Sequence, residues 1–281
     1  MDRARRLVCA LVAAVALLCA AAVPAGAAGS RELTVMTFNI AHGAVAGGDL
    51  RRVAAVIRSA HPDVVGLQEV DRSWSRSGGA DQAAQLGGLL GMRSHFVASL
   101  DCAASDAEGD GFCQYGTAIL SRFPVVAGSG RRYRLPVRPG EEPRTLARVG
   151  ISVGGRVVDV FNTHLSFLEP TRIRQAGLIK RLLRLDRRPF VLTGDLNALP
   201  FQFEMVSLRQ VARDAAMAAG RPGLRTTALS HPVRLDYVML PRPSIDGPPR
   251  QVAALSAHVV YVARVSDHRP LVARIRVPAT G

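Results

Sequence analysis

The chain has 281 residues, of which 48% are hydrophobic and 21% charged, and this composition excludes a disordered or fibrous protein because a sizeable core can be buried. Its formal net charge is +14 at pH 7, carried almost entirely by arginine, with Lys180 the one lysine. Such a surface attracts polyanions such as nucleic acid or an anionic membrane, although genome base bias can also enrich arginine.

The first 28 residues have the pattern of a secretory signal peptide. Three arginines lie within the first six residues, residues 7–23 are apolar, and Ala25, Gly26 and Ala27 form a small-residue cleavage pattern. A lipoprotein signal ending at Cys19 is the weaker alternative, because Leu18 is large where a small residue is expected. We therefore predict a secreted, extracellular protein.

Residues 29–281 would then form a single mature α/β domain, because no later run is long enough to span a bilayer. Removal of residues 1–27 takes away three arginines and Asp2, so the formal net charge falls by 2, from +14 to +12. Two of the four cysteines leave with the signal, and Cys102 and Cys113 remain on either side of a segment rich in Gly, Asp and Ser. An exported protein with one close pair is expected to oxidise it to a disulfide, and metal binding by the two cysteines is the less favoured alternative.

In the first half of the chain, short apolar runs end in polar side chains. β-branched and aromatic residues predict strands over residues 33–40 and 63–67, followed by Asn39 at the end of the first and Glu69 after the second. Helical spacing predicts a helix over 50–60 with Asp49 as its cap, and a shorter, glycine-weakened helix over 81–90.

The middle of the chain alternates between strand patterns and an arginine-rich segment. Residues 115–122, starting at Tyr115, predict a third strand. Residues 131–148 contain many Arg and Pro residues and are expected to be a long exposed loop, in which Arg144 is the residue that best suits a phosphate contact.

A hairpin and a helix follow. Gly154 and Gly155 separate strands predicted over 148–153 and 156–161, and His164 closes the second strand. Apolar residues at helical spacing predict a helix over 171–185 with a basic opposite side.

Residues 190–200 form the central stretch of the sequence. An apolar run that starts at Phe190 predicts a buried strand, and Asp195 falls where that strand should end. On extended backbone Asn197 would face the same way as Asp195, two residues earlier, so the pair could orient a water molecule and hold a phosphate oxygen. A turn is the alternative for these residues. Pro200 is expected to begin a helix that runs to about residue 219.

The last third contains two more polar clusters at strand ends. A strand is predicted over 234–240 with Asp236 near its start, and Asp267 and His268 precede the final strand, 271–277. Residues 241–249 are a proline-rich connection.

Strand ends in a packed α/β sheet converge on one edge, so we expect these polar residues to meet. Four carboxylates and two histidines in one cleft would repel one another or shift one another's pKa unless a cation is present. Hard oxygen ligands suit Mg²⁺, with Mn²⁺ as the alternative, and such an ion supports phosphate-ester cleavage.

The ordered polar motifs resemble those of the endonuclease/exonuclease/phosphatase (DNase I-like) superfamily. The resemblance covers nearly all of residues 29–281 and implies a four-layered α/β/β/α sandwich of two packed mixed sheets. The motifs are Thr37-Phe38-Asn39-Ile40, Gly66-Leu67-Gln68-Glu69-Val70, Tyr115 to Arg122, Asn162-Thr163-His164-Leu165-Ser166, Gly194-Asp195-Leu196-Asn197, Leu235-Asp236-Tyr237 and Ser266-Asp267-His268-Arg269-Pro270.

The resemblance also implies roles for individual residues. Glu69 would be the main Mg²⁺ ligand, supported by Asn39 and Asp267. Asp195 would orient or deprotonate the attacking water, and Asn197 and His164 would hold phosphate oxygens. His268, held by Asp236, would stabilise the transition state or act as acid or base. Tyr115 falls near the position of a family tyrosine that contacts substrate.

Three functions follow from these observations. The first is a secreted Mg²⁺-dependent phosphodiesterase acting on DNA or RNA, which the charge of +12 favours. The second is a phospholipid, sphingomyelin or phosphoinositide hydrolase, although the sequence shows no long apolar or aromatic loop of the kind that touches membranes. The third is a non-catalytic polyanion-binding domain, which would not need intact Glu69, Asp195, Asn197, Asp236 and His268. We expect a monomer without a protein partner.

Overall fold

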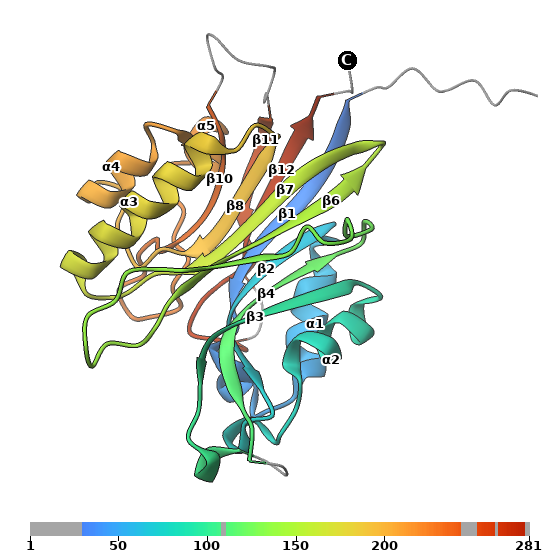
Figure 1. Cartoon of the computed structure of the whole chain (residues 1–281). Coiled ribbons are helices and arrows are strands. Elements are labelled where there is room, and N and C mark those ends of the chain that lie inside the picture. Colours follow the sequence, from blue (N-terminus) through green and yellow to red (C-terminus); the bar gives the residue numbers. More distant parts are fainter. Residues whose placement is uncertain (1–29, 108–110, 243–251, 262–263, 279–281) are drawn as a thin grey trace, which may run out of the picture.

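Most strands of this chain are buried on both faces, which explains their nearly continuous apolar sequences. The computed structural model describes residues 30–107, 111–242, 252–261 and 264–278, so the signal-peptide prediction lies outside the described residues. Two mixed sheets of six strands pack face to face, with helices on the outer face of each (Figure 1). The predicted four-layered sandwich is confirmed.

Each sheet contains one parallel pair, β1 with β2 and β7 with β8, among antiparallel neighbours. The first sheet has the order β11 (Ala253–Val259), β12 (Leu271–Val277), β1 (Arg31–Asn39), β2 (Val64–Arg72), β4 (Gln114–Ser121) and β3 (Arg93–Asp101). The second has the order β5 (Arg131–Arg134), β6 (Thr145–Val153), β7 (Arg156–His164), β8 (Phe190–Asp195), β10 (Asp236–Pro241) and β9 (Ala212–Asp214).

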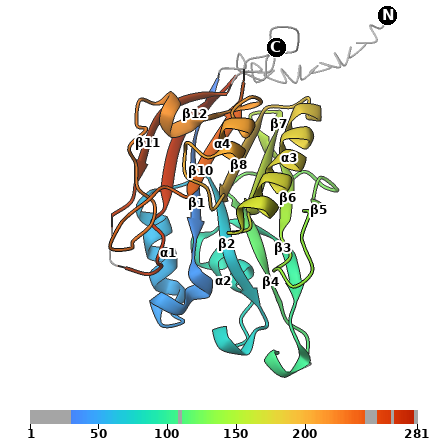
Figure 2. The ribbon, with the colours of Figure 1, turned by 90° about the vertical axis from the view of Figure 1, so that its left-hand side faces the viewer.

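Helices α1 (Leu50–Ser59) and α2 (Gln82–Leu90) cover the first sheet, and α3 (Glu169–Leu185) and α4 (Phe203–Leu208) cover the second (Figure 2). The other helical segments are η1 (Ala41–Ala46), η2 (Ser75–Ser77), η3 (Ala104–Asp106) and α5 (Ala215–Ala218). Asp49 caps α1 as predicted, accepting a hydrogen bond from Arg51 N. None of the helices in the described ranges has both the length and the apolar character of a membrane span.

Side chains that alternate between the two faces of each strand form three apolar cores: one between the sheets and one under the helices on each outer face. In β1, Val35 packs into the core between the sheets, whereas Met36 and Phe38 pack into the core under α1 and α2. In β8, Val191 faces the other sheet and Leu192 packs under α3 and α4. A period of two therefore serves both faces of each sheet.

A buried polar cluster joins the two sheets at their centre. Gln68 Nε2 of β2 donates to Asn162 Oδ1 of β7 over 2.7 Å, and Thr193 Oγ1 of β8 donates to the same oxygen over 3.1 Å. Gly66 is required here, because a Cβ at that position would lie 2.0 Å from Thr193 Oγ1. Gln68 directly precedes Glu69, and Asn162 lies two residues before His164. Their hydrogen bond therefore links the ends of β2 and β7 beside the site.

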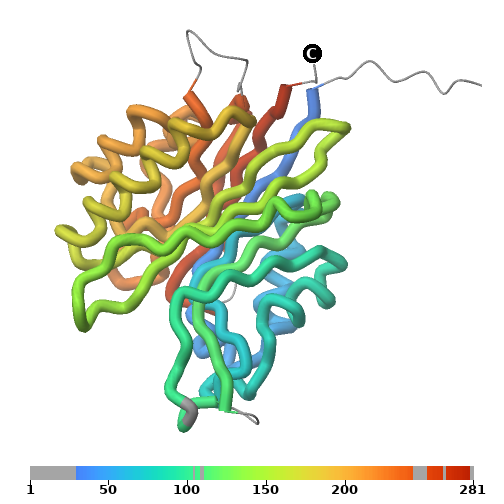
Figure 3. Tube along the Cα trace, viewed as in Figure 1, coloured from blue at the N-terminus to red at the C-terminus, as the bar shows by residue number. Residues whose placement is uncertain are grey.

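Three sequence expectations about secondary structure were incomplete or wrong, and two strands were missed. The strand predicted over 63–67 continues to Arg72, and strands β3 and β11 were not anticipated. The arginine-rich segment 131–148 is not a continuous loop, because β5 and the start of β6 lie within it. The helix predicted over 200–219 is broken into α4, β9 and α5 (Figure 3), because β10 offers β9 an edge to pair with at the end of the sheet.

Cys102 and Cys113 form a disulfide, as the sequence predicts. We expect the double variant Cys102→Ser/Cys113→Ser to lose about 3 kcal/mol of unfolding free energy. The disulfide joins two residues that are 11 positions apart, and without it the unfolded chain gains conformational entropy. Calorimetry should then show a melting temperature about 5–10 °C lower, and reduced wild-type protein should shift equally. Equal melting temperatures for oxidised wild type and the variant would contradict the prediction.

Candidate active site

Strand pairing brings the polar strand ends to one edge of the sandwich. The parallel pairs β1–β2 and β7–β8 end at this edge, with Asn39 opposite Gln68 and His164 opposite Asp195. In the antiparallel pair of β8 and β10, Asp236 lies opposite Asp195. His164, Asp195 and Asp236 therefore stand side by side on three neighbouring strands.

Asp195 lies at the centre of the cluster. Its Oδ2 accepts a hydrogen bond from Asn39 Nδ2 over 3.1 Å and lies 3.6 Å from Nε2 of both His164 and His268. The other oxygen, Oδ1, accepts from the backbone N–H of Asn197 over 2.9 Å. Burial, followed by the negative charge of Asp236, raises the pKa of Asp195 to about 7.

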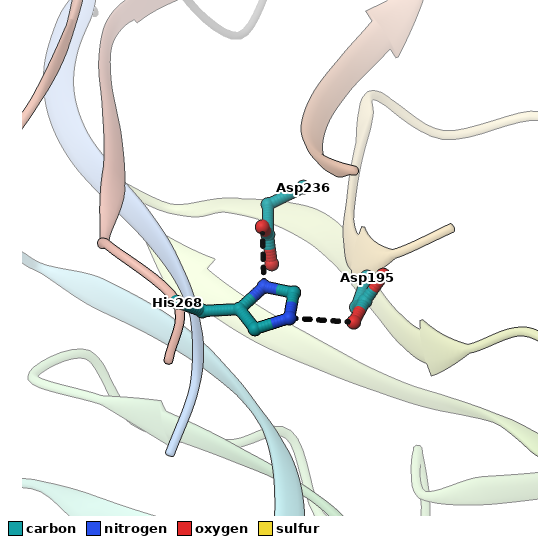
Figure 4. Close-up of side chains that lie close together, drawn as sticks. All are labelled: Asp195, Asp236 and His268. Atoms are coloured by element: carbon teal, nitrogen blue, oxygen red, sulfur yellow. Dashed lines mark hydrogen bonds and ion pairs between the residues drawn. The ribbon is translucent and has the colours of Figure 1, made fainter. Parts of the chain in front are cut away.

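His268 bridges two carboxylates (Figure 4). Its Nδ1 lies 2.8 Å from Asp236 Oδ2, and its Nε2 points toward Asp195. Burial alone would lower the pKa of His268, but the charge and hydrogen bond of Asp236 outweigh burial and raise that pKa to about 10. His268 is therefore a cation at neutral pH. It lies beside the carboxyl group of Asp195, whose pKa is raised to about 7.

His164 has the opposite character. Burial, followed by the positive charge of Arg144, lowers its pKa well below the usual value, so the ring is neutral. Arg144 Nη1 donates to Nδ1 over 2.8 Å, which leaves the hydrogen on Nε2. Nε2 lies 3.1 Å from Asn197 Nδ2, which also donates to the carbonyl oxygen of Leu165, so the imidazole and the amide stand together beside Asp195.

Asn197 reaches this position by a turn, not by extended backbone. Its φ is 49°, and its N–H closes a turn onto Asp195 Oδ1. The prediction that the two side chains share one space is correct, but the extended geometry behind it was wrong. Phe190–Asp195 form the predicted strand, and Asp195 to Asn197 form the turn that was the alternative, so each prediction describes part of this stretch.

Glu69 occupies a β-bulge in β2, where the pairing with β4 shifts register between Gln68 and Val70. Its φ is 55°, a conformation that non-glycine residues seldom adopt and that recurs at functional sites. Asn39 Nδ2 donates to Glu69 Oε1 over 2.8 Å. Burial alone would raise the pKa of Glu69, but His42, His164 and Asn39 outweigh it and lower the pKa to about 2.

His42 belongs to the site and was not anticipated. Its Nδ1 lies 3.7 Å from Glu69 Oε2, and its φ is 42°. It stands in a 3₁₀ segment after β1, and a lone histidine in a loop gives no signal in the sequence.

Asp267 is held at the same edge through its neighbour. Ser266 Oγ donates to the carbonyl oxygen of Asn39 over 2.7 Å and lies 3.3 Å from Asp267 Oδ1. The negative charge of Asp267 also contributes to the raised pKa of His268.

Arg144 is buried, with 6% of its surface exposed, although its segment was expected to be a solvated loop. Besides His164 it contacts Glu142 Oε1 over 2.8 Å. Tyr115 lies nearby, and burial, followed by the charge of Glu69, raises the pKa of its hydroxyl, so Tyr115 stays neutral. Its ring meets Trp74 edge-on, with ring centroids 6.4 Å apart.

The donor set fits a divalent cation on the Glu69 side of the site. Among the described residues, the ion-pair partners of Glu69, Asp195 and Asp236 are all histidines, so no Lys or Arg neutralises these carboxylates. Asp195, Asp236 and His268 also lie close enough together to resemble a metal site.

Comparisons with known proteins agree with this geometry. The sequence profile of the Endonuclease/Exonuclease/phosphatase family matches residues 36–268. A solved endonuclease/exonuclease/phosphatase from Beutenbergia cavernae is 30% identical over 88% of this chain and 72% of its own, with a TM-score of 0.70.

Two more distant structures share the fold. TDP2 from Caenorhabditis elegans is 25% identical over 87% of this chain and 74% of its own, with a TM-score of 0.61. A mannosyl-6-phosphatase from Bacteroides thetaiotaomicron is 17% identical over 86% and 99%, with a TM-score of 0.62. No curated protein matches the chain significantly.

Proposed function

Since the chain belongs to the endonuclease/exonuclease/phosphatase family of phosphoesterases, we propose that it is a secreted enzyme that hydrolyses phosphodiester bonds with the help of a divalent metal ion. One observation carries the proposal: the buried Asp195 carboxylate lies 3.6 Å from two histidine Nε2 atoms of opposite character. A neutral His164 donor, a cationic His268 and a base of raised pKa are the groups that attack on a phosphodiester needs.

Glu69 would hold the metal ion, with Asn39 and Asp267 beside it. Mg²⁺ is the ion that we propose, because carboxylate oxygens are its usual protein ligands. Asn39 turns its Nδ2 toward Glu69 while its oxygen accepts from the N–H of Ala41, so its part is to orient the Glu69 carboxylate. When bound, the ion supplies positive charge that neutralises phosphoryl oxygens.

The protein residues perform the proton transfers. Asp195 takes a proton from water as the water oxygen bonds to phosphorus, and the bond from phosphorus to the leaving oxygen breaks. His268 stabilises the negative charge that develops, or gives its proton to the leaving oxygen. The products are a phosphomonoester and an alcohol, so atoms and charge balance.

We favour a diester over a monoester. His164 is neutral, and the charge of Arg144 is shared with Glu142. The positive charge that these two groups offer suits the single charge of a diester better than the two charges of a monoester.

We expect His268→Asn to lower kcat by about 10²–10³-fold, because the variant loses the cation beside Asp195. Asp236→Asn should lower kcat by about 10-fold, since the imidazole then loses the partner that holds it charged and oriented. In the double variant the loss should equal that of His268→Asn alone, because Asp236 acts through His268. Additive losses in steady-state kinetics would contradict this pairing.

A substrate panel tests the proposed reaction. Purified protein with Mg²⁺ should hydrolyse bis(p-nitrophenyl) phosphate faster than p-nitrophenyl phosphate. The panel also contains plasmid DNA, RNA, sphingomyelin, phosphatidylglycerol vesicles, an inositol phosphate and mannose 6-phosphate. Turnover of monoesters alone would overturn the diester proposal.

Two substrate classes compete within the proposal. The formal charge of +12 that remains without residues 1–27 supports nucleic acid, which is the class that the sequence favours. The surface beside the site supports phospholipid instead, because exposed phenylalanine side chains cluster there. Export remains a proposal that rests on residues 1–28, and it predicts a mature protein in the culture medium whose N-terminus lies near residue 29.

A further inference from the structure

An exposed apolar cluster lies on the α3–α4 side of the molecule. Its large side chains expose between 39% and 75% of their surface, whereas apolar side chains of this size are normally buried. We call this cluster the apolar rim; it consists of Phe167 (69%), Leu168 (39%), Phe201 (75%), Phe203 (64%) and Val206 (46%).

A buried ion pair holds the two halves of the apolar rim together. Arg172 Nη1 of α3 donates to the carbonyl oxygen of Phe167 over 2.9 Å, and its Nε pairs with the carboxylate of Glu204. Both partners are almost fully buried, and Glu204 is the residue after Phe203. The exposed phenylalanines are therefore fixed in place by the fold.

The apolar rim adjoins the proposed active site. Asn197 Nδ2 donates to the carbonyl oxygen of Leu165 over 2.9 Å, which joins the loop after β7 to the loop after β8. Phe167 is three residues after His164, and Phe201 is four residues after Asn197. A lipid or protein surface that covers the rim would therefore bring its own surface groups close to His164 and Asn197.

A basic surface continues from the rim along α3. Arg174, Arg181 and Arg184 are exposed and recur at the spacing of one helix face, and Glu169 is the exposed acid of this helix. Phenylalanine and leucine beside exposed arginines is the combination that interfacial proteins use on anionic lipid.

We propose that the apolar rim and the basic face of α3 dock on an anionic phospholipid surface, and that the substrate is a phospholipid presented at this interface. The proposal rests on the proposed function and names its substrate class. A lipid surface matches both parts, since its acyl boundary accepts phenylalanine and its headgroups carry negative charge. A second copy of the chain would oppose arginine with arginine, and duplex nucleic acid keeps its bases stacked away from the rim.

The test replaces Phe203 of α4 and Phe201 of the loop before it, which are among the most exposed side chains of the rim. In Phe201→Ser/Phe203→Ser, co-sedimentation with phosphatidylglycerol/phosphatidylcholine vesicles should weaken about tenfold or more, because two interfacial rings are lost. Hydrolysis of phosphatidylglycerol in those vesicles should fall in parallel. Hydrolysis of bis(p-nitrophenyl) phosphate should change less than about twofold, since both rings lie outside the catalytic cluster.

Phe112→Ser is the matched control. Phe112 is 48% exposed in the loop between β3 and β4 of the other sheet, outside both the rim and the basic face of α3, so this change should leave vesicle binding unchanged. The charge contribution is tested by Arg181→Glu/Arg184→Glu, which should weaken binding to anionic vesicles.

Three outcomes would overturn the proposal. The first is equal vesicle binding by wild type and Phe201→Ser/Phe203→Ser. The second is a wild type that binds single-stranded DNA but not vesicles, with the double variant losing the DNA binding. The third is a wild-type dimer that the double variant dissociates. If wild type binds vesicles but cleaves no diester, the proposed function fails while the docking surface stands.

Discussion

Asp195→Asn should lower kcat for phosphodiester hydrolysis by about 10³–10⁴-fold, because asparagine cannot accept the proton of the attacking water. Asparagine has nearly the same shape, and its one oxygen can keep the hydrogen bond from the backbone N–H of Asn197, whereas the hydrogen bond from Asn39 to the other oxygen is lost. The substrate KM should therefore change much less than kcat.

The fold should survive this change, because it replaces a buried carboxyl whose ionised form is disfavoured. Melting temperature and circular dichroism report the fold, and bis(p-nitrophenyl) phosphate turnover reports the chemistry. Asp101→Asn is the matched control, since Asp101 is exposed on β3 and contacts Gln114. Activity within tenfold of wild type in Asp195→Asn would remove Asp195 from the role of base.

Chelation with EDTA should abolish hydrolysis, and added Mg²⁺ should restore it, because the proposed ion neutralises the phosphoryl oxygens. Glu69→Gln should weaken Mg²⁺ binding by about 100-fold or more, which exceeds the usual effect of a residue that only orients a ligand. Among the described residues no Lys or Arg pairs with Glu69, so a cation is its natural partner.

Isothermal titration calorimetry with Mg²⁺ measures this change independently of turnover. Glu32→Gln provides the matched control, since Glu32 is an exposed carboxylate on β1 that pairs with Arg274 and Arg276. Equal Mg²⁺ affinity in Glu69→Gln and wild type would show that the ion binds elsewhere, and full activity in EDTA would show that hydrolysis needs no metal.

Much of the fold was predictable because both faces of the strands are buried. The final strand, 271–277, matches β12, and the glycine pair at 154–155 separates β6 from β7 with positive φ at both positions. Asp49 caps α1 as expected, where local chemistry decides the start of a helix.

The errors fall where a neighbouring strand overrides a local pattern. Residues 131–134 look like loop, yet β6 offers them a pairing edge, and residues 212–214 leave a predicted helix to pair with β10. Strands β3 and β11 were missed because their residues are partly exposed and lack a long apolar run.

The exposed phenylalanines of the apolar rim show the same limit for surfaces. Phe201 and Phe203 alternate as core residues do, and no sequence pattern distinguishes them from buried ones. Their exposure arises because α4 turns Met205 and Leu208 inward and leaves Phe203 and Val206 outside.

The sequence by itself determined which residues meet at one edge of the sandwich, because each of Asn39, Glu69, His164, Asp195, Asp236 and His268 stands at or beside the end of an apolar run. Only the tertiary structure decided how they act. Strand register and the packing of two sheets set the 2.8 Å contact between His268 and Asp236, the bulge at Glu69 and the placement of His42. These depend on contacts between residues 27 or more positions apart, and the pKa of each group follows from the neighbours that those contacts bring.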